Sequence, residues 1–595
     1  MKILLVAVNA KYIHSNLAVY SLRAYAEKYR DQIEIAEYTI NHYTDDILQD
    51  LYKRKPDVVA FSCYIWNLSH VRALIGDFHK LMPDTPIWLG GPEVSYDAEE
   101  FLREFPMVRG IMTGEGEKSF HKLAHYYAGK SAVRQDEEAA FSGIEGITYR
   151  GRNGNIIVNH ACSVMDMSGI PFAYEDMADF KNKIIYYESS RGCPFSCSYC
   201  LSSIDKKLRF RDTELVKKEL GFFLDEKVPQ VKFVDRTFNC SHGHAMEIWR
   251  FLKENDNGIT NFHFEIAADL LNEEEMDLIR TMRPGLIQLE IGVQSTNPRT
   301  IQEIDRTMDF ATLSRVVAKI RSGGNIHQHL DLIAGLPYEG YESFSSSFND
   351  VYALKPDQLQ LGFLKVLKGS KMHRNAGSYG IVYKSSPPYE VLYTKWLSYD
   401  EVLKLKGVEE MVELFYNSAQ FTASIRQLET LFETPFELYT RLWEFYQDRG
   451  YSVAGPSRMG RYDILLEFAK ENAPENEGMY KDLLLFDLYA RENLKSRPSW
   501  AKDAEALKEH KERIRAFYME EEKTPVYLKG YEGYQYKQLS KMTHIEVFEW
   551  NAAKGAPLAG EDRGSYMVLF DYRNRNPLTK DAAVYVVEQG EGGGR

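Results

Sequence analysis

The chain has 595 residues, too many for one hydrophobic core, and its 44% apolar and 27% charged residues are typical of a globular protein. The net charge of −13 argues against a general electrostatic grip on nucleic acid, which needs a basic surface. The N-terminus shows no signal-peptide cleavage site, and no apolar stretch reaches the roughly 18 residues of a membrane span. We therefore expect several domains, a cytoplasmic location and no nucleic acid partner.

The first 130 residues alternate apolar runs with amphipathic stretches. Strands are predicted at 3–8, 33–40, 57–66, 86–92 and 108–114, and helices at 16–29, 44–55, 67–82, 96–104 and 117–128. This alternation predicts a doubly wound, Rossmann-like parallel sheet. Ligands of such sheets bind beyond the carboxyl ends of the strands, where four loops gather: Asn9–Ser15, Cys63–Asn67, Gly90–Ser95 and Gly114–Glu117.

A linker with a small hairpin is predicted after this domain. GITYR and IIVNH flank GRNGN, whose asparagines and glycines are typical of a turn. We assign residues 1–135 to the N-terminal domain and residues 136–180 to the linker.

Half of the cysteines lie in one short loop, RGCPFSCSYC, as Cys193, Cys197 and Cys200. The remaining three stand alone in the sequence: Cys63, Cys162 and Cys240. Structural zinc normally takes two short ligand pairs, and no second pair exists here. Three thiolates from one loop suit an iron–sulfur cubane whose fourth iron stays open. A zinc knuckle with His242 or His244 as fourth ligand is the alternative.

This stretch resembles the cluster loop of the radical S-adenosylmethionine (radical SAM) superfamily, in which an aromatic residue such as Tyr199 precedes the last cysteine. The resemblance implies a catalytic 4Fe–4S cluster held by Cys193, Cys197 and Cys200. Its open iron would bind the amino and carboxylate groups of SAM, and its reduction would release a 5′-deoxyadenosyl radical. An electron donor such as a flavodoxin or a ferredoxin is also implied.

Six β/α repeats surround this loop, with strands at 183–190, 230–235, 262–269, 286–295, 325–337 and 357–367. They predict a partial (β/α)6 barrel over residues 181–370, with its active site at the carboxyl ends of the strands. The resemblance implies SAM contacts by Tyr199, Asp235, Glu265, Gln294 and Ser295. Asp235 stands where the family has Gly-Gly-Glu, and both glycines are missing.

A doubly wound domain before such a barrel resembles the cobalamin-binding domain of the cobalamin-dependent subclass, and LGGPEVS and TGEGEKSF resemble its two glycine loops. The implied cobalamin contacts are Asn9, Tyr12, Ser62, Gly90, Gly91, Gly114, Glu115 and Gly116. The Asp-x-His-x-x-Gly signature of the mutases is absent, because Asn9–His14 reads NAKYIH. We therefore expect cobalamin without a histidine from that motif, and His14 as a loop residue. A flavodoxin-like or structural α/β unit is the alternative.

A mainly helical domain with an aromatic core is predicted for residues 385–595, because aromatic residues and leucines recur there at helical spacing. Three β-like runs, HIEVFEWN, YMVLFDYR and AAVYVVEQ, predict a small sheet, and the tail GEGGGR is expected to be disordered. This third resembles an uncharacterised domain that accompanies some cobalamin-dependent radical SAM proteins.

Together these features predict an α/β protein that is a cobalamin-dependent radical SAM enzyme, a C-methyltransferase acting at an unactivated carbon. Its substrate would be an unknown small molecule, lipid or peptide. Two alternatives remain. One is an enzyme that uses the same cofactors for cyclisation, ring contraction or oxygen insertion without methylation. The other is a non-catalytic cobalamin-binding sensor.

Overall fold

The computed structural model describes residues 1–129, 137–494, 496–501 and 510–587. The chain divides into two compact units. Unit 1 contains Met1–Gln328, Ile333–Gly340 and Gly362–Ser398, and unit 2 contains His329–Leu332, Tyr341–Leu361 and Tyr399–Arg595. The predicted boundary at residue 135 and the tail GEGGGR lie outside the described residues.

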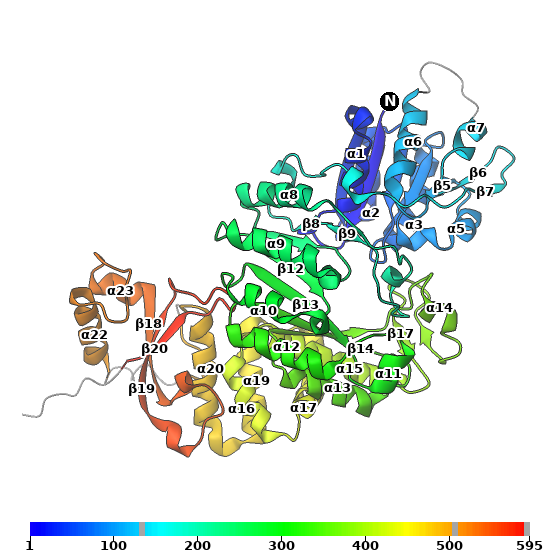
Figure 1. Cartoon of the computed structure of the whole chain (residues 1–595). Coiled ribbons are helices and arrows are strands. Elements are labelled where there is room, and N and C mark those ends of the chain that lie inside the picture. The colour runs from blue at the N-terminus through cyan, green and yellow to red at the C-terminus, as the bar shows by residue number, and fades with distance from the viewer. Residues whose placement is uncertain (130–136, 495, 502–509, 588–595) are drawn as a thin grey trace, which may run out of the picture. The chain divides into compact units, whose positions relative to one another are not determined.

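Unit 1 begins with a seven-stranded sheet in the order β2-β1-β3-β4-β5-β6-β7, drawn in blue and cyan in Figure 1. Its parallel strands are β1 (Ile3–Asn9), β2 (Ile33–Thr39), β3 (Val58–Ser62), β4 (Ile87–Gly90) and β5 (Val108–Met112). The strands are buried apolar runs because helices cover both faces of the sheet. The order reverses between β1 and β3, which is the switch point where such sheets bind ligands.

Helices α1 (Leu17–Tyr25) and α6 (Gly116–Gly129) pack together, as do α2 (Thr44–Arg54) and α3 (Leu68–Leu81). The short helices α4 (Pro92–Ser95) and α5 (Ala98–Glu104) follow β4. Leu51, Leu74 and Phe101 contribute to the apolar core that these elements share with the sheet. The sequence pattern predicted each of the five strands of this domain.

The expected linker hairpin belongs to this sheet instead of standing apart from it. Strands β6 (Ile147–Arg150) and β7 (Ile156–Val158) form the hairpin, and β6 pairs antiparallel with β5, for example Ile111 with Thr148. The added strands satisfy the backbone groups that β5 would otherwise expose as a sheet edge. Helix α7 (Glu137–Ser142) precedes them.

The second sheet follows in the order β15-β14-β13-β12-β11-β8. Its strands are β8 (Ile185–Tyr187), β11 (Gln230–Phe233), β12 (Asn261–Ile266), β13 (Ile287–Gln294), β14 (His327–Ala334) and β15 (Gln358–Phe363). All pairs between β8 and β13 are parallel. These six strands match the six predicted ones, and the sheet is the partial barrel.

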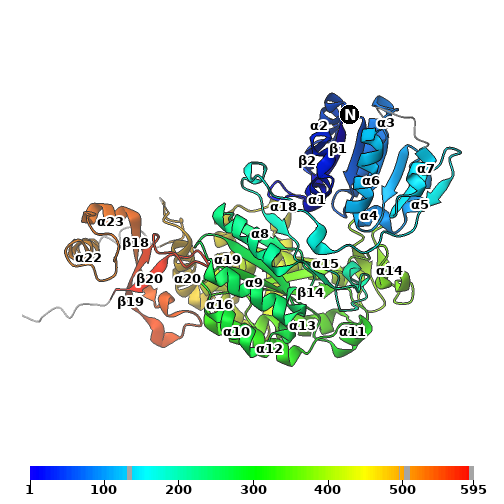
Figure 2. The same cartoon turned by 45° about the horizontal axis from the view of Figure 1, so that its top comes forward.

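Helices α8 (Thr213–Asp225), α9 (His242–Glu254), α10 (Glu273–Arg280) and α12 (Phe310–Gly323) follow one another along this sheet, and each packs on the next (Figure 2). Helix α11 (Pro298–Glu303) precedes α12. Unit 1 ends with α14 (Lys371–Asn375), β16 (Val382–Tyr383) and β17 (Val391–Tyr393).

Unit 2 is mainly helical, with an aromatic core that includes the fully buried Tyr439 and Tyr462. Their burial agrees with the predicted aromatic core. Its helices are α13 (Tyr341–Ala353), α15 (Tyr399–Met411), the π-helix η7 (Val412–Asn417), α16 (Thr422–Leu428), α17 (Pro435–Asp448), α18 (Tyr451–Ala454), α19 (Arg458–Asn472), α20 (Glu477–Arg491), α22 (Lys511–Lys523) and α23 (Tyr536–Met542).

The predicted small sheet of unit 2 is antiparallel, with strands β18 (Thr543–Trp550), β19 (Arg563–Asp571) and β20 (Ala583–Val586). Across the described parts of both units, no helix combines the length and the apolar character needed to cross a bilayer.

Candidate active site

The three clustered cysteines lie in a loop closed by a short antiparallel ladder. Strand β9 (Ser190–Arg191) enters the loop and β10 (Arg209–Phe210) leaves it. Cys193 and Cys197 are buried, Cys200 is half-buried, and all three thiols are free. Structural zinc is held by four ligands, whereas three thiolates suit a cubane cluster whose fourth iron stays open. The donor set therefore fits a multi-iron cluster better than a zinc ion.

The histidines proposed for a zinc knuckle have other partners. The Nε2 atom of His244 lies 2.9 Å from the Ser189 hydroxyl, and the Nδ1 atom of His242 lies 2.8 Å from the Asn272 amide nitrogen. Both histidines thus have hydrogen-bond partners other than the three cysteines.

Burial lowers the pKa of His244 from its ordinary 6.5 to about 4. The folded chain thus binds fewer protons than the unfolded chain between pH 4 and 6.5, and stability falls as the pH drops through this window. We expect the free energy of unfolding to fall by about 2 kcal/mol more in the wild type than in His244→Gln between pH 7.5 and 5. Denaturant unfolding of the apoprotein, followed by tryptophan fluorescence at each pH, measures the difference. An equal fall of the free energy of unfolding with pH in the two proteins would contradict the prediction.

A large cavity of unit 1 opens beside the cysteine loop. Its volume is about 1090 Å³, at the upper end of ordinary ligand sites. The N-terminal sheet contributes loops at the carboxyl ends of β1, β3, β4 and β5, and the barrel contributes residues of β8, β9, β11 and β12. The residues flanking the cysteines, including Gly192 and Leu201, also border it.

Seven of the eight predicted cobalamin contacts line this cavity: Asn9, Ser62, Gly90, Gly91, Gly114, Glu115 and Gly116. Tyr12 does not line it, and its side chain is 66% exposed. His14 borders the cavity, and its Nδ1 atom lies 2.7 Å from the Tyr186 hydroxyl. Burial lowers the pKa of His14 below its ordinary value, so the ring is neutral at pH 7.

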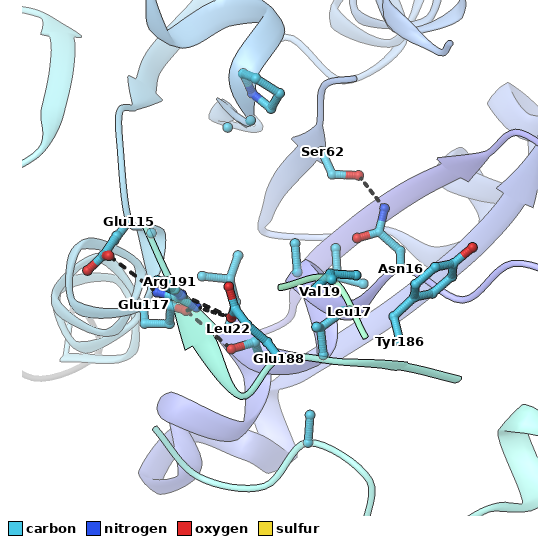
Figure 3. A pocket seen from close by; sticks show the side chains of 18 of the residues that line it. Asn16, Leu17, Val19, Leu22, Ser62, Glu115, Glu117, Tyr186, Glu188 and Arg191 are labelled. Carbon is cyan, nitrogen blue, oxygen red and sulfur yellow. Dashed lines mark hydrogen bonds and ion pairs between the residues drawn. The ribbon is translucent and has the colours of Figure 1, made fainter. Parts of the chain in front are cut away.

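Asn16 is a cavity residue that the sequence did not single out. Its amide nitrogen donates to the Ser62 hydroxyl at 3.2 Å (Figure 3), while its Oδ1 atom is buried without a partner. A buried acceptor left unsatisfied is costly, so this atom points to a ligand in the cavity. The cavity size, the glycine loops and this orphan acceptor together fit a large amide-bearing ligand such as cobalamin.

The predicted SAM contacts separate into two groups. Glu265 lines the cavity, and the half-buried Gln294 has a buried Oε1 atom without a partner and a left-handed φ of 74°. Asp235 is fully buried and accepts from the Ser189 amide, the Ser189 hydroxyl and the Ser190 hydroxyl. Burial raises the pKa of Asp235 to about 6, although these hydrogen bonds oppose the shift.

Ser295 is also satisfied within the protein, because it donates to Glu339 at 2.6 Å and accepts from the Asn297 amide. The remaining predicted SAM residue, Tyr199, is half-buried, and its hydroxyl lies 3.3 Å from the Arg306 guanidinium. Asp235 and Ser295 thus fix the ends of β11 and β13, while Gln294 and Glu265 have positions that suit a ligand.

Arg191 connects the two halves of the cavity (Figure 3). Its guanidinium lies 2.5 Å from Glu117, 2.9 Å from Glu188 and 3.7 Å from Glu115. Burial alone would raise the pKa of Glu117, but the Arg191 charge outweighs it and holds that pKa below its ordinary value. The second glycine loop is thus tied to the strand that leads into Cys193.

We expect Arg191→Met to lower stability by about 3 kcal/mol, because it leaves the buried carboxylate of Glu117 without its cation. Thermal unfolding and the cobalamin retained after gel filtration are the measurements. Arg103→Met is the matched control, since its ion pair with Glu99 is exposed and should contribute less than about 1 kcal/mol. Equal behaviour of the two variants would contradict a role for Arg191 in joining the halves.

Family comparisons agree with this arrangement. Residues 3–124 match the B12 binding domain, and residues 187–351 match the Radical SAM superfamily. The chain is a radical SAM protein with a B12-binding domain. Residues 377–570 of this radical SAM protein match DUF4080, a domain of unknown function. This match confirms the predicted uncharacterised C-terminal domain. The two matches confirm the predicted kinds of cofactor, one domain for cobalamin and one for SAM and its cluster.

Curated relatives of the radical SAM protein include the cobalamin-dependent radical SAM methyltransferase TokK of Streptomyces tokunonensis, 25% identical over 49% of this chain. A second is the 2-(S-pantetheinyl)-carbapenam-3-carboxylate methyltransferase of Streptantibioticus cattleyicolor, 24% identical over 67% of this chain. The chain spans 44% and 63% of the lengths of these two relatives.

Two solved structures share the fold of the radical SAM protein. OxsB with aqua-cobalamin bound has a TM-score of 0.57 at 14% identity and covers 87% of this chain and 84% of its own. TsrM from Kitasatospora setae, with cobalamin and a [4Fe-4S] cluster bound, has a TM-score of 0.53 at 16% identity. The match covers 65% of this chain and 79% of the TsrM chain. The predicted fold class is confirmed.

Proposed function

We propose that this chain is a cobalamin-dependent radical SAM enzyme that transfers a methyl group to an unactivated carbon. The observation that carries the proposal is the shared cavity, which is bordered both by the loops of the B12-binding domain and by the residues flanking Cys193 and Cys200. The methyltransferase names of TokK and of the carbapenam methyltransferase support the same class of reaction.

Within this proposal, each cofactor has its own set of residues. Cys193, Cys197 and Cys200 hold the 4Fe–4S cluster, and Tyr199, Glu265 and Gln294 contact SAM. Asp235 and Ser295 support that site through the strand ends that they fix. The cobalamin contacts are Asn9, Asn16, Ser62, Gly90, Gly91, Gly114, Glu115 and Gly116.

When bound, the cluster and SAM supply a radical that takes a hydrogen atom from carbon, and methylated cobalamin supplies the methyl group. The chain contributes placement and solvent exclusion. Leu17, Val19 and Leu22 present apolar side chains to the cavity (Figure 3), which limits water near a reactive radical. Placing both cofactors at one cavity shortens the path between them, which is a positioning effect.

The substrate we propose is a small molecule, lipid or peptide, and the electron donor a flavodoxin or ferredoxin. The test needs neither. The full chain, reconstituted anaerobically with iron, sulfide and hydroxocobalamin, is incubated with titanium citrate and SAM carrying a CD3 methyl group. We expect 5′-deoxyadenosine, S-adenosylhomocysteine and CD3-labelled methylcobalamin, all detected by mass spectrometry.

The competing functions predict different products in the same experiment. An enzyme that uses both cofactors without methylation would form 5′-deoxyadenosine and no labelled methylcobalamin. A non-catalytic sensor would bind cobalamin and form neither product. Either result would contradict the proposed methyl transfer.

A further inference from the structure

The middle of the cysteine loop is held from two sides by backbone hydrogen bonds. The Ser198 amide donates to the Ile304 carbonyl at 2.8 Å, and the Ser198 carbonyl accepts from the Met372 amide at 2.8 Å. Ser198 itself is only 3% exposed. Because Ile304 is fixed against the loop, Arg306, two residues further on, has a defined position beside the cysteines.

The Arg306 guanidinium faces the loop. One of its terminal nitrogens, Nη1, lies 3.8 Å from the Cys197 sulfur and 3.3 Å from the Tyr199 hydroxyl. The other, Nη2, donates to the carbonyl of Gly292 on β13. A side chain at position 292 would crowd this arrangement, because its Cβ would lie 2.2 Å from the Gln294 amide nitrogen and 3.5 Å from Nη2.

No carboxylate neutralises this cation within the part of the chain that the structure describes. The side chains that contact its Nη1 atom are Tyr199 and Cys197, and its Nε atom is buried without a partner among the described residues. Arg306 is half-buried, and a cation partly withdrawn from water is unfavourable unless a negative group faces it. The negative group that can face it is a metal centre that Cys197 binds as a thiolate.

We infer that Arg306 raises the reduction potential of the cluster held by Cys193, Cys197 and Cys200. Reduction adds one electron from the donor to the cluster, and no bond forms or breaks. A cation beside a ligand sulfur stabilises the more negative, reduced form, since charge and hydrogen bonds to sulfur set the potentials of such clusters. The inference rests on the cluster of the proposed function and adds the residue that sets how readily it is reduced.

The test is a redox titration of the anaerobically reconstituted full chain, monitored by electron paramagnetic resonance, without SAM and without cobalamin. Omitting both keeps other ligands of Arg306 out of the measurement. At the wild-type midpoint potential, we expect Arg306→Gln to have a ratio of reduced to oxidised cluster at least tenfold lower than the wild type. For a one-electron couple, this corresponds to a midpoint potential at least 59 mV lower. Arg306→Lys, which keeps the charge, should lie closer to the wild type.

Arg299→Gln is the matched control. It removes one positive charge from α11, which lies between β13 and α12 as Arg306 does. The Arg299 side chain, however, is exposed and stacks on Tyr338, 3.8 Å from the ring centroid. Its midpoint should equal that of the wild type. An unchanged midpoint in Arg306→Gln at full iron content would overturn the inference and leave Arg306 with a purely structural role.

A second variant covers the case in which Arg306→Gln does not retain iron. Gln294→Glu places a carboxylate next to the guanidinium and should also lower the midpoint, whereas an unchanged midpoint would overturn the inference. If the wild type itself shows no 4Fe–4S signal, the proposed function fails. If a cluster forms but its midpoint potential does not depend on Arg306, only the inference fails.

Discussion

Replacing Cys193, Cys197 or Cys200 singly with alanine is expected to abolish formation of 5′-deoxyadenosine from SAM, with a loss of at least 1000-fold, on the order of 4 kcal/mol in the barrier. The reason is the donor count. The loop offers three thiolates, and the fourth iron must stay open, so two thiolates leave a second iron without a protein ligand. Iron and sulfide content, the absorbance near the cluster band and product formation under dithionite are the measurements.

Cys162→Ala is the control for these variants. Cys162 is half-buried and lies outside the loop, so its variant should keep both the cluster and the activity. Cobalamin binding should survive in all four proteins, because the contacts proposed for it lie in the N-terminal domain. Turnover by any of the three loop variants at wild-type rate would contradict the assignment of the cluster.

Gly91→Ala is expected to weaken cobalamin binding more than tenfold and to destabilise unit 1 by about 3 kcal/mol. Gly91 has φ 110° and ψ 168°, a conformation that is open essentially to glycine alone. A Cβ there would lie 2.4 Å from the Cys63 carbonyl oxygen, which is backbone and cannot turn away. The loop after β4 would have to move, and with it the wall of the cavity.

Titration of the apoprotein with hydroxocobalamin and thermal unfolding measure the two effects. The matched control is Gly76→Ala in α3, where a Cβ meets nothing within 4 Å. That variant should bind cobalamin normally and be as stable as the wild type or more so, because alanine favours a helix over glycine by about 1 kcal/mol. Equal affinities of Gly91→Ala and Gly76→Ala would contradict the role of this loop.

The architecture was predictable because its signals are local. Continuous apolar runs separated by amphipathic stretches predict parallel strands covered on both faces, and the spacing of Cys193, Cys197 and Cys200 lies within eight residues. The pairing of β6 with β5 was missed, because a turn signal predicts a hairpin but does not say which sheet edge the hairpin will join.

Site residues were harder to predict, since a place at a strand end fixes the edge of the sheet but not the direction of a side chain. Asp235 and Ser295 turn towards partners inside the protein, whereas Gln294 retains a free buried acceptor. Arg306 belongs to no motif, and its contact with Cys197 joins residues far apart in the chain.

Asn16 shows what kind of signal was available. In the sequence it is the first residue of the helix predicted at 16–29, where asparagine is an ordinary N-cap. In the structure its side chain makes no capping hydrogen bond and turns to Ser62 instead. A helix-capping residue that leaves its helix uncapped is informative, but only the three-dimensional structure reveals that it does so.

The hydrogen bond from the Met372 amide to the Ser198 carbonyl has a consequence for biosynthesis. A growing chain that has just exposed all of its cluster ligands still lacks Met372, which completes the hydrogen bonds of the loop. During translation the cysteine loop therefore lacks one of its hydrogen bonds. We expect stable cluster insertion only after the ribosome has passed position 372. Truncated versions that end before this position are expected to lose iron even though every cysteine is present.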